Sequence, residues 1–424
     1  MEGLLKFIHA ADIHLDSPLV GLQLYEGAPV EEIRGATRKA LQNLVELAAA
    51  EKVDFILIAG DLYDGDWKDF NTGLFLYSQM ARLRDEGIRV FIISGNHDAA
   101  SQITKHLRMH ENVKYLSVRN PETVIIEELD LAIHGQGYPV RAVTEDMTGA
   151  YPLASPYHFN IGLLHTSLDG RQGHEPYAPT NATSLLTKGY DYWALGHVHA
   201  REIVHEAPWI VFPGNMQGRH IRETGPKGCM LVEVEYGQVI RVEPRELDVM
   251  RWAVATADAG KAADGDDVLQ AASKILTRTF KENKEMPLAV RLEIIGATKA
   301  HRVLLSNPER WKSELRAIAT DISGGTMWLE KIRFSTKDAI DTAVLIAKNP
   351  ALVELMNSID GLAGDADLVK AAVEALGDLG EKLPHELKTG DEAIRLDDPE
   401  TVKRVAEGVR QVLMDRILAG GEEL

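Results

Sequence analysis

The first half of the chain alternates between short apolar runs and longer stretches in which apolar residues recur at helical spacing. The runs at 7–10, 55–59 and 90–94 contain few polar residues, which is typical of strands buried on both faces. The stretches at 31–51 and 70–86 place their apolar residues on one side of a helix. Buried strands separated by helices predict an α/β layered core.

Between residues 113 and 245 the predicted elements become shorter, and strands dominate. Six apolar runs predict strands in this region, at 124–126, 131–133, 161–164, 192–195, 209–212 and 230–234. Pro244 lies in the polar stretch 243–248, which predicts the end of a first domain at residue 245.

A different pattern follows this boundary and predicts two further regions. Three strand-like runs and two helical stretches predict a small α+β domain over 246–336, with strands at 252–255, 288–295 and 327–334 and helices at 267–282 and 308–319. Residues 337–424 show no convincing strand. Helical stretches at 337–359, 366–376 and 398–418 are separated by glycines and a proline, so we predict a helical C-terminal tail.

The composition is that of an ordinary soluble protein. Hydrophobic residues make up 45% and charged residues 26% of the 424 residues, which excludes global disorder. The formal net charge is −18, and residues 346–424 carry 9 basic and 17 acidic side chains. Such a surface repels phosphates at long range and argues against indiscriminate binding of nucleic acid. Phosphate binding would therefore need local basic groups, metal ions or a basic partner.

The sequence also indicates a cellular compartment. Cys229 is the only cysteine, so an internal disulfide is impossible and a zinc cluster held by thiolates is excluded. We expect a reducing, cytoplasmic environment. The N-terminal residues lack the features of a signal peptide, and no stretch approaches the roughly 18 apolar residues of a membrane helix, so we expect no membrane association.

Side chains able to bind metals follow the predicted strands of the first domain. Because parallel strands end at one edge of an α/β sheet, these side chains should meet there. Residues two apart in an extended segment point to the same side, so Asp12 with His14, and His197 with His199, can each supply two ligands. Carboxylate, amide and imidazole groups together suit Mn²⁺, Fe²⁺ or Zn²⁺. The complete set is Asp12, His14, Asp61, Asn96, His97, Asp98, His165, His197 and His199.

Asp12-Ile13-His14 alone is as well explained by hydrogen-bonded core residues, and Gly60-Asp61 alone carries almost no information. Their order along the chain, however, resembles that of the calcineurin-like metallophosphoesterases over about residues 5–240. The resemblance implies a layered β-sandwich flanked by helices, with two divalent metal ions. It implies that one ion is held by Asp12, His14, Asp61 and His199. The second would be held by Asp61, Asn96, His165 and His197, with Asp61 bridging. His97 matches the catalytic histidine, and Asp98 its orienting partner.

Three segments narrow the resemblance to one branch of this family. Residues 9–15 and 60–64 resemble the SbcD-type DNA repair exonucleases, and residues 212–229 are most similar to the YhaO-like members. This resemblance implies a DNA-capping domain at 246–336 and Mn²⁺ as the metal. It further implies a tail that binds the coiled-coil root of an SbcC-type ATPase, and a homodimer formed through helices such as 34–47 or 70–83. Some relatives carry a histidine where Asp64 stands, a position that bears on the balance between endonuclease and exonuclease action.

The leading hypothesis is thus a DNA repair nuclease, a 3′→5′ exonuclease with endonuclease activity on single strands. Arg219, His220, Arg222 and Lys227 form a cationic cluster that could position DNA phosphates, although a solvated loop would have the same composition. One alternative is a phosphatase or phosphodiesterase acting on small nucleotides, which would use the same ligands but would not need the extra domain. Another is a scaffold subunit that does not cut, which would not need His97.

Overall fold

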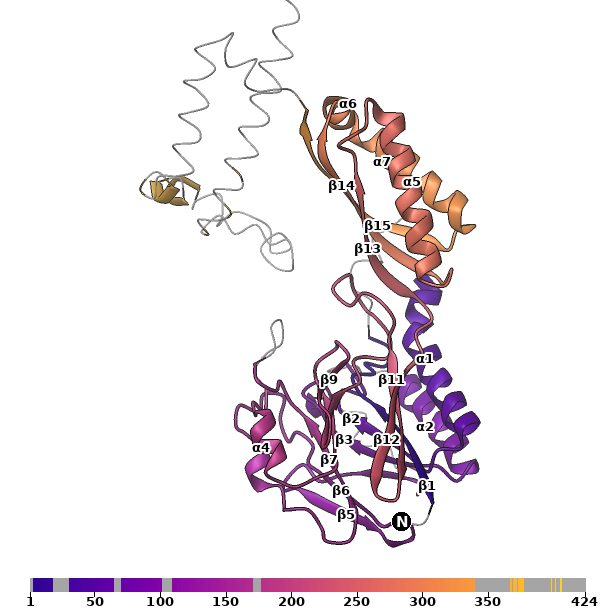
Figure 1. Ribbon diagram of the computed structural model, residues 1–424, viewed down its shortest axis with the longest axis vertical. Helices are drawn as coiled ribbons and strands as arrows, with labels where there is room; N and C mark the ends of the chain where they lie inside the picture. Colours follow the sequence, from indigo (N-terminus) through magenta and orange to yellow (C-terminus); the bar gives the residue numbers. More distant parts are fainter. Residues whose placement is uncertain are drawn as a thin grey trace, which may run out of the picture. The chain divides into compact units, whose positions relative to one another are not determined.

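The computed structural model describes residues 3–17, 30–64, 70–100, 109–170 and 177–339, and a few tail residues (367, 369–371, 373–376, 398, 401 and 405). The N-terminal region contains two six-stranded sheets (Figure 1). The first sheet consists, in spatial order, of β12 (Gln238–Glu246), β11 (Gly228–Glu235), β1 (Leu4–Ala10), β2 (Phe55–Ala59), β3 (Arg89–Ile93) and β4 (Val113–Tyr115). The second consists of β5 (Glu122–Ile126), β6 (Leu131–Gly135), β7 (Phe159–His165), β8 (Tyr192–Gly196), β10 (Trp209–Phe212) and β9 (Glu202–His205).

The two sheets pack face to face and are covered by helices, as Figure 1 shows. Strands β1 to β4 are parallel, as are β6, β7, β8 and β10. Helices α1 (Val30–Glu51) and α2 (Phe70–Asp85) bury their apolar sides on the first sheet. The short helix α4 (Ala182–Leu186) packs Leu185 against the outer face of the second sheet, beside Trp193. These layers confirm the predicted α/β sandwich flanked by helices.

The proline that suggested the first boundary lies inside a strand. Pro244 is paired with Met230 in the antiparallel ladder of β11 and β12. This is tolerated because β12 is at the edge of its sheet, where a missing backbone donor can face outward. The polar stretch 243–248 therefore overlaps the end of β12, and the predicted boundary at 245 stays a prediction.

A small three-stranded sheet follows, with helices between its strands. Its order is β13 (Arg251–Asp258), β14 (Leu288–Thr298) and β15 (Met327–Asp338), and β13 runs parallel to β14. The helices are α5 (Gly265–Glu282), α6 (His301–Ser306) and α7 (Pro308–Ser323). The predicted strands and helices of 252–334 are all present. Burial alternates along β13, because one face of the strand is buried and the other is exposed. This alternation explains why its apolar and polar residues predicted a strand.

By its internal contacts the chain divides into two compact units. The first comprises 1–258, 266–295 and 309–335, and the second 259–265, 296–308 and 336–424. Most of the predicted tail helices lie outside the described residues, although 367, 369–371 and 373–376 are helical. The predicted boundary at 336/337 stays a prediction. Among the described helices, none is both long and apolar enough to cross a membrane.

The apolar stripes proposed for a dimer interface face the interior. Ala40, Leu44 and Ala48 of α1 belong to the core cluster beneath the first sheet, as do Leu76 and Met80 of α2. These side chains are at most 1% exposed and are not available to a second subunit. Leu74 and Tyr77 on the other side of α2 are 59% and 36% exposed, and the predicted homodimer stays a prediction.

Candidate metal centre

The predicted ligands converge at one edge of the sandwich, where strands of both sheets end. Asp12 and His14 follow β1, Asp61 follows β2, His165 ends β7, and His199 follows β8. The two sheets approach closely at this edge. A Cβ atom at Gly196 would lie 1.9 Å from the carbonyl oxygen of Ala59, so only glycine fits at the end of β8. The fold thus brings together groups that lie nearly 190 positions apart in the sequence.

Several of these residues have a strained backbone. Asp12, His14, Asp61 and His197 adopt positive φ angles of 49°, 45°, 52° and 98°. L-residues other than glycine rarely adopt such angles, and they occur most often where surrounding structure enforces them at functional sites. Here each angle occurs as the chain leaves a strand and turns a side chain toward the common centre.

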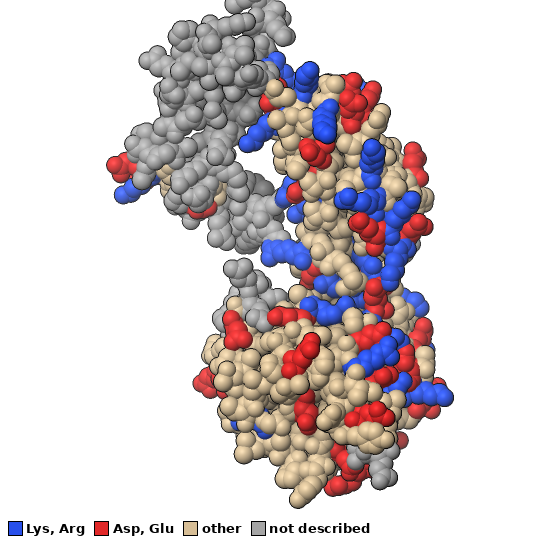
Figure 2. Space-filling model, viewed as in Figure 1, with Lys and Arg blue, Asp and Glu red and all other residues tan. Residues whose placement is uncertain are grey.

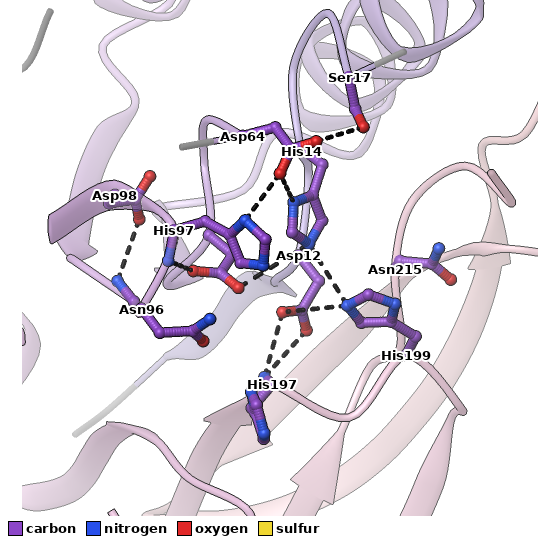
Figure 3. Close-up of polar contacts among 12 residues, drawn as sticks. Asp12, His14, Ser17, Asp64, Asn96, His97, Asp98, His197, His199 and Asn215 are labelled. Atoms are coloured by element: carbon purple, nitrogen blue, oxygen red, sulfur yellow. Dashed lines mark hydrogen bonds and ion pairs between the residues drawn. The ribbon is translucent and has the colours of Figure 1, made fainter. Parts of the chain in front are cut away.

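The first group of potential ligands is Asp12, His14 and His199, whose ligand atoms all lie within 4.8 Å of one another. The Nε2 atoms of His14 and His199 are 3.3 Å apart, and His199 Nε2 is 3.8 Å from Asp12 Oδ1. Figure 3 shows the three side chains facing one another. His199 Nδ1 lies 2.5 Å from Glu223 Oε1, so Nδ1 carries the proton and the Nε2 lone pair points inward. An inward lone pair beside a carboxylate and a second imidazole is the donor set that a divalent cation requires.

The second group is Asp12, Asp61 and His165, which is fully buried. His165 Nδ1 donates to the carbonyl oxygen of Ala59 at 2.8 Å, which directs its Nε2 inward. That Nε2 lies 3.0 Å from Asn96 Oδ1 and 3.5 Å from Asp61 Oδ2. Three potential ligand atoms therefore converge on one point, so the residues fit a second metal ion, which would take the place of a proton on Nε2.

Asp61 connects these two groups, and His197, whose ring belongs to neither of them, lies beside them. Asp61 Oδ2 lies 3.8 Å from His14 Nε2 in the first group and 3.5 Å from His165 in the second. The backbone N–H of His197 donates to both Asp12 oxygens, at 3.0 and 3.1 Å. The imidazole of His197 lies beside that of His165, with ring centroids 5.2 Å apart. The placement of Asp61 is that of a bridging ligand.

Asp61 and His165 shift each other's pKa values. Burial would raise the pKa of Asp61, but the charge of His165 and its hydrogen bond outweigh this and hold the pKa well below its ordinary value. Burial would lower the pKa of His165, but the charge of Asp61 and the hydrogen bond to it raise that pKa to about 9. Asp61 is therefore ionised at neutral pH.

His97 forms a third group of potential ligands with His14 and Asp64, and this group adjoins the first through His14. His97 Nδ1 is 2.7 Å from Asp64 Oδ1, while Ser17 Oγ donates to Asp64 Oδ2 at 2.6 Å. Asp64 also lies 3.7 Å from His14 Nδ1, and Figure 3 shows it between the two imidazoles. Burial would lower the pKa of His97, but the hydrogen bond to Asp64 and the charge of Asp61 raise it overall. The His97 side chain is 29% exposed, so its ring can reach a substrate.

The structure corrects the role expected for Asp98. The carboxylate of Asp98 accepts backbone N–H groups of Leu62, Tyr63 and Gly95, at 3.1, 2.8 and 3.0 Å. Asp98 begins a short 3₁₀ helix (Asp98–Ala100), which turns its side chain back toward these amides. It therefore fixes the loops that carry Asp61 and Asn96, whereas the carboxylate that contacts the His97 ring is Asp64.

Glu223 was not anticipated as part of the site. Besides contacting His199, it accepts the Asn215 side-chain amide at 2.9 Å and the Arg219 backbone N–H at 2.7 Å. Burial would raise the pKa of Glu223, but the hydrogen bond and charge of His199 hold it well below its ordinary value. Glu223 lies within the segment 212–229 that the sequence singled out, but no spacing rule connects it to a metal ligand.

The four residues of the cationic cluster have different surroundings. Lys227 is only 8% exposed, and its Nζ donates to the carbonyl oxygen of His199 at 3.0 Å, which removes it from the expected phosphate-binding group. The guanidinium of Arg219 contacts Ser17 Oγ at 3.2 Å and lies 3.7 Å from Asp64. His220 Nε2 lies 3.4 Å from Glu223, with its side chain 40% exposed, and Arg222 is exposed. His220 and Arg222 are thus the members best placed to meet a ligand from solution.

A two-sheet sandwich whose strand ends carry two adjoining sets of Asp, His and Asn ligands defines a hydrolase of the metallophosphoesterase type. Residues 5–201 match the calcineurin-like phosphoesterase family, and residues 252–337 match the middle domain of the metallophosphoesterase YhaO. The chain is 38% identical over 296 residues to the uncharacterized metallophosphoesterase YhaO of Bacillus subtilis, an alignment that covers 69% of this chain and 72% of that protein. The chain therefore belongs to the calcineurin-like metallophosphoesterases and has a YhaO-like middle domain.

More distant relatives include proteins named for DNA repair. The DNA double-strand break repair protein Mre11 of Methanopyrus kandleri is 26% identical over 276 residues, covering 58% of each chain. The protein of the same name from Sulfurisphaera tokodaii is 24% identical over 269 residues, covering 59% of this chain and 65% of the relative. The family's chemistry is metal-dependent hydrolysis of phosphoesters, and the ligand groups described above fit divalent metals.

Proposed function

We propose that this chain is a two-metal phosphodiesterase that cuts DNA, acting as a 3′→5′ exonuclease with endonuclease activity on single strands and using Mn²⁺. The observation that carries the proposal is the pair of ligand groups connected by Asp61, with His97 beside them. The distant similarity to Mre11 proteins and the additional domain after β12 support DNA as the substrate.

The protein's own groups would act on the phosphodiester in defined ways. Two bound divalent ions would clamp the phosphate and lower the pKa of a water molecule that attacks phosphorus in line. His97 would donate its Nε2 proton to the leaving oxygen as the P–O bond breaks. Asp64 would keep Nδ1 of His97 protonated and orient the ring. The backbone N–H of His97 donates to Asp61 Oδ1 at 2.9 Å, which fixes the ring's distance from the bridging carboxylate.

Electrostatics set limits on how the chain can bind DNA. With a net charge of −18, it approaches a polyanion against its own field. Exposed cations such as Arg222 act only at short range, because screening at physiological salt weakens their field beyond about 8 Å. Figure 2 shows Lys and Arg side chains interspersed with Asp and Glu over the visible face, rather than one basic surface. We therefore expect weak DNA binding by the isolated chain.

We expect Mn²⁺-dependent release of nucleotides from the 3′ ends of linear duplex DNA. The assay uses duplexes labelled at the 3′ or the 5′ end, circular single-stranded DNA, and bis(4-nitrophenyl) phosphate as a small diester. An Asp61→Asn preparation, purified in parallel, excludes contaminating nucleases. Hydrolysis of the small diester with every DNA left intact would contradict the nuclease proposal and favour the small-nucleotide alternative. Inactivity on all substrates with metals bound would favour the scaffold alternative.

We further propose that the tail binds the coiled-coil root of an SbcC-type ATPase. In the sequence of this tail, Val402, Val405, Val409 and Leu413 recur at helical spacing, which suits a helix that binds in a groove. A chain ending at residue 340 should retain Mn²⁺-dependent hydrolysis of the small diester but lose co-purification with the ATPase and any ATP-stimulated cutting of DNA. Unchanged affinity of the truncated chain for the ATPase would contradict this assignment.

A further inference from the structure

The loop between β10 and β11, residues 213–227, contacts the candidate metal centre and strand β13 at the same time. We call it the connecting loop. At the metal centre, Glu223 binds His199 Nδ1 through one carboxylate oxygen. The other oxygen accepts the backbone N–H of Arg219 at 2.7 Å, and the Arg219 side chain reaches Ser17 and the vicinity of Asp64. The loop therefore supports a predicted ligand and also lies beside the partner of His97.

The same loop is bound to the start of β13. Trp252 Nε1 donates to the carbonyl oxygen of Gly218 at 3.1 Å, and the backbone N–H of Gly225 donates to the carbonyl oxygen of Trp252 at 3.2 Å. The side chain of Gln217 donates to Met250 O at 2.8 Å and accepts the N–H of Val249 at 3.0 Å. Four hydrogen bonds thus join the loop to residues 249–252.

Tight apolar packing stabilises this junction. Ile221 of the loop packs in one buried cluster with Ala36 of α1, Met250, Trp252 and Ala289 of β14. A Cβ atom at Gly218 would lie 2.8 Å from the carbonyl oxygen of Glu223 and 3.1 Å from Trp252 Cδ1, so the Trp252 ring lies directly against the loop. Packing this close leaves little room for the loop to move independently of the start of β13.

The contacts form a short route from Trp252 to His199. Trp252 binds Gly218, the next residue is Arg219, the Arg219 amide binds Glu223, and Glu223 binds His199 Nδ1. A carboxylate that accepts the Nδ1 proton of a metal-binding histidine fixes the tautomer and the direction of its Nε2 lone pair. Displacement of Trp252 would therefore shift the ligand atom of His199 through a single loop.

We propose that Glu223 is a positioning residue for His199 and that Trp252, at the start of the YhaO-like middle domain, sets the position of Glu223 through the connecting loop. This inference rests on the proposed metal centre. It predicts that the start of β13 and the metal ion bound by His199 are energetically coupled. A substitution at the start of β13 should therefore change the affinity of that metal ion.

The test is a double-mutant cycle on Mn²⁺ affinity, read from the electron paramagnetic resonance signal of free Mn²⁺ in titrations of the full chain. Glu223→Gln should weaken one of the two Mn²⁺ dissociation constants by about 10–100-fold, as expected for loss of a carboxylate partner of a ligand. Trp252→Phe keeps an aromatic ring but replaces the indole with a smaller phenyl group that lacks the Nε1–H, and it should weaken Mn²⁺ binding at the same site by about 3–10-fold. In the double variant, Mn²⁺ affinity should fall no further than in Glu223→Gln alone. Both substitutions act through the contact between Glu223 and His199, so the second has no additional effect.

Trp311→Phe is the matched control. Trp311 is another buried tryptophan, on α7, and it lies outside the cluster that contains Trp252, so this variant should leave both constants unchanged. If Trp252→Phe does not fold, Gln217→Met replaces it, since it removes two bonds of the junction while keeping side-chain length. The proposed coupling would be overturned if the losses of Mn²⁺ affinity added up in the double variant. It would also be overturned if Trp311→Phe lost as much Mn²⁺ affinity as Trp252→Phe. A wild-type chain that binds no Mn²⁺ would instead overturn the proposed metal centre itself.

Discussion

Replacing His97 with alanine is expected to lower kcat on a phosphodiester by about 10²–10⁴-fold while the chain still binds its metals. His97 is grouped with His14 and Asp64, and its ring contacts Asp64 instead of entering the group formed by Asp12, Asp61 and His165. Its loss removes the proton donor for the leaving oxygen and leaves the predicted ligands in place. The measurement is kcat with bis(4-nitrophenyl) phosphate, together with metal content by elemental analysis of the same sample.

Asp64→Asn is the companion variant to His97→Ala. It retains the shape of the side chain but removes the charge that holds the Nδ1 proton of His97, so we expect a smaller loss of kcat with metal content unchanged. Asp98→Asn affects backbone amides instead of the His97 ring, so its effect should be seen mainly in thermal stability. Loss of metal in His97→Ala would show that His97 is a ligand. A loss of kcat in Asp98→Asn greater than in Asp64→Asn would contradict the assignment of Asp64.

Replacing Asp61 with asparagine should affect both metals at once. Asp61 is the carboxylate that reaches His14 in one group and His165 in the other, and its pKa lies well below the ordinary value, so it is ionised at neutral pH. Without its charge, we expect metal content to fall below one ion per chain. We expect kcat to fall about a thousandfold or more, since metal ions supply several kcal/mol of transition-state stabilisation.

His165→Ala is the control for Asp61→Asn, because His165 belongs to one ligand group only. It should lose mainly the second metal ion and retain the first. Elemental analysis of both variants after Mn²⁺ loading distinguishes them. Equal metal content in Asp61→Asn and the wild type would show that Asp61 is not a bridging ligand.

The sequence was most informative where function depends on residues that directly follow buried strands. The runs before Asp12, Asp61 and Asn96 lie in strands β1, β2 and β3, whose residues 7–10, 55–59 and 90–93 are all buried. Their apolar pattern was therefore unambiguous, and their ends met as expected. Strand β9 (Glu202–His205) and edge strand β12 were not predicted, because their burial is incomplete and their sequences are largely polar. β9 is recognisable as a strand only from its pairing with β10, and β12 only from its pairing with β11.

The residues that support the site were harder to find than the predicted ligands. Asp98 was assigned to His97 from the family resemblance, but its carboxylate accepts the backbone N–H groups of Leu62, Tyr63 and Gly95 instead. The actual partner, Asp64, comes from the loop after β2. Glu223 reaches His199 only because the connecting loop folds back over the strand ends. Such contacts depend on tertiary structure and leave no local pattern of apolar and polar residues.

The most direct test of the two-metal centre is the number of metal ions that the wild-type chain binds. After Mn²⁺ reconstitution and removal of excess metal, elemental analysis of the full chain should find close to two ions, and the same sample should hydrolyse bis(4-nitrophenyl) phosphate. This result follows from two adjoining ligand groups that share Asp12 and are bridged by Asp61. A wild-type metal content near zero, with the chain folded, would contradict the assignment of these residues as a metal centre.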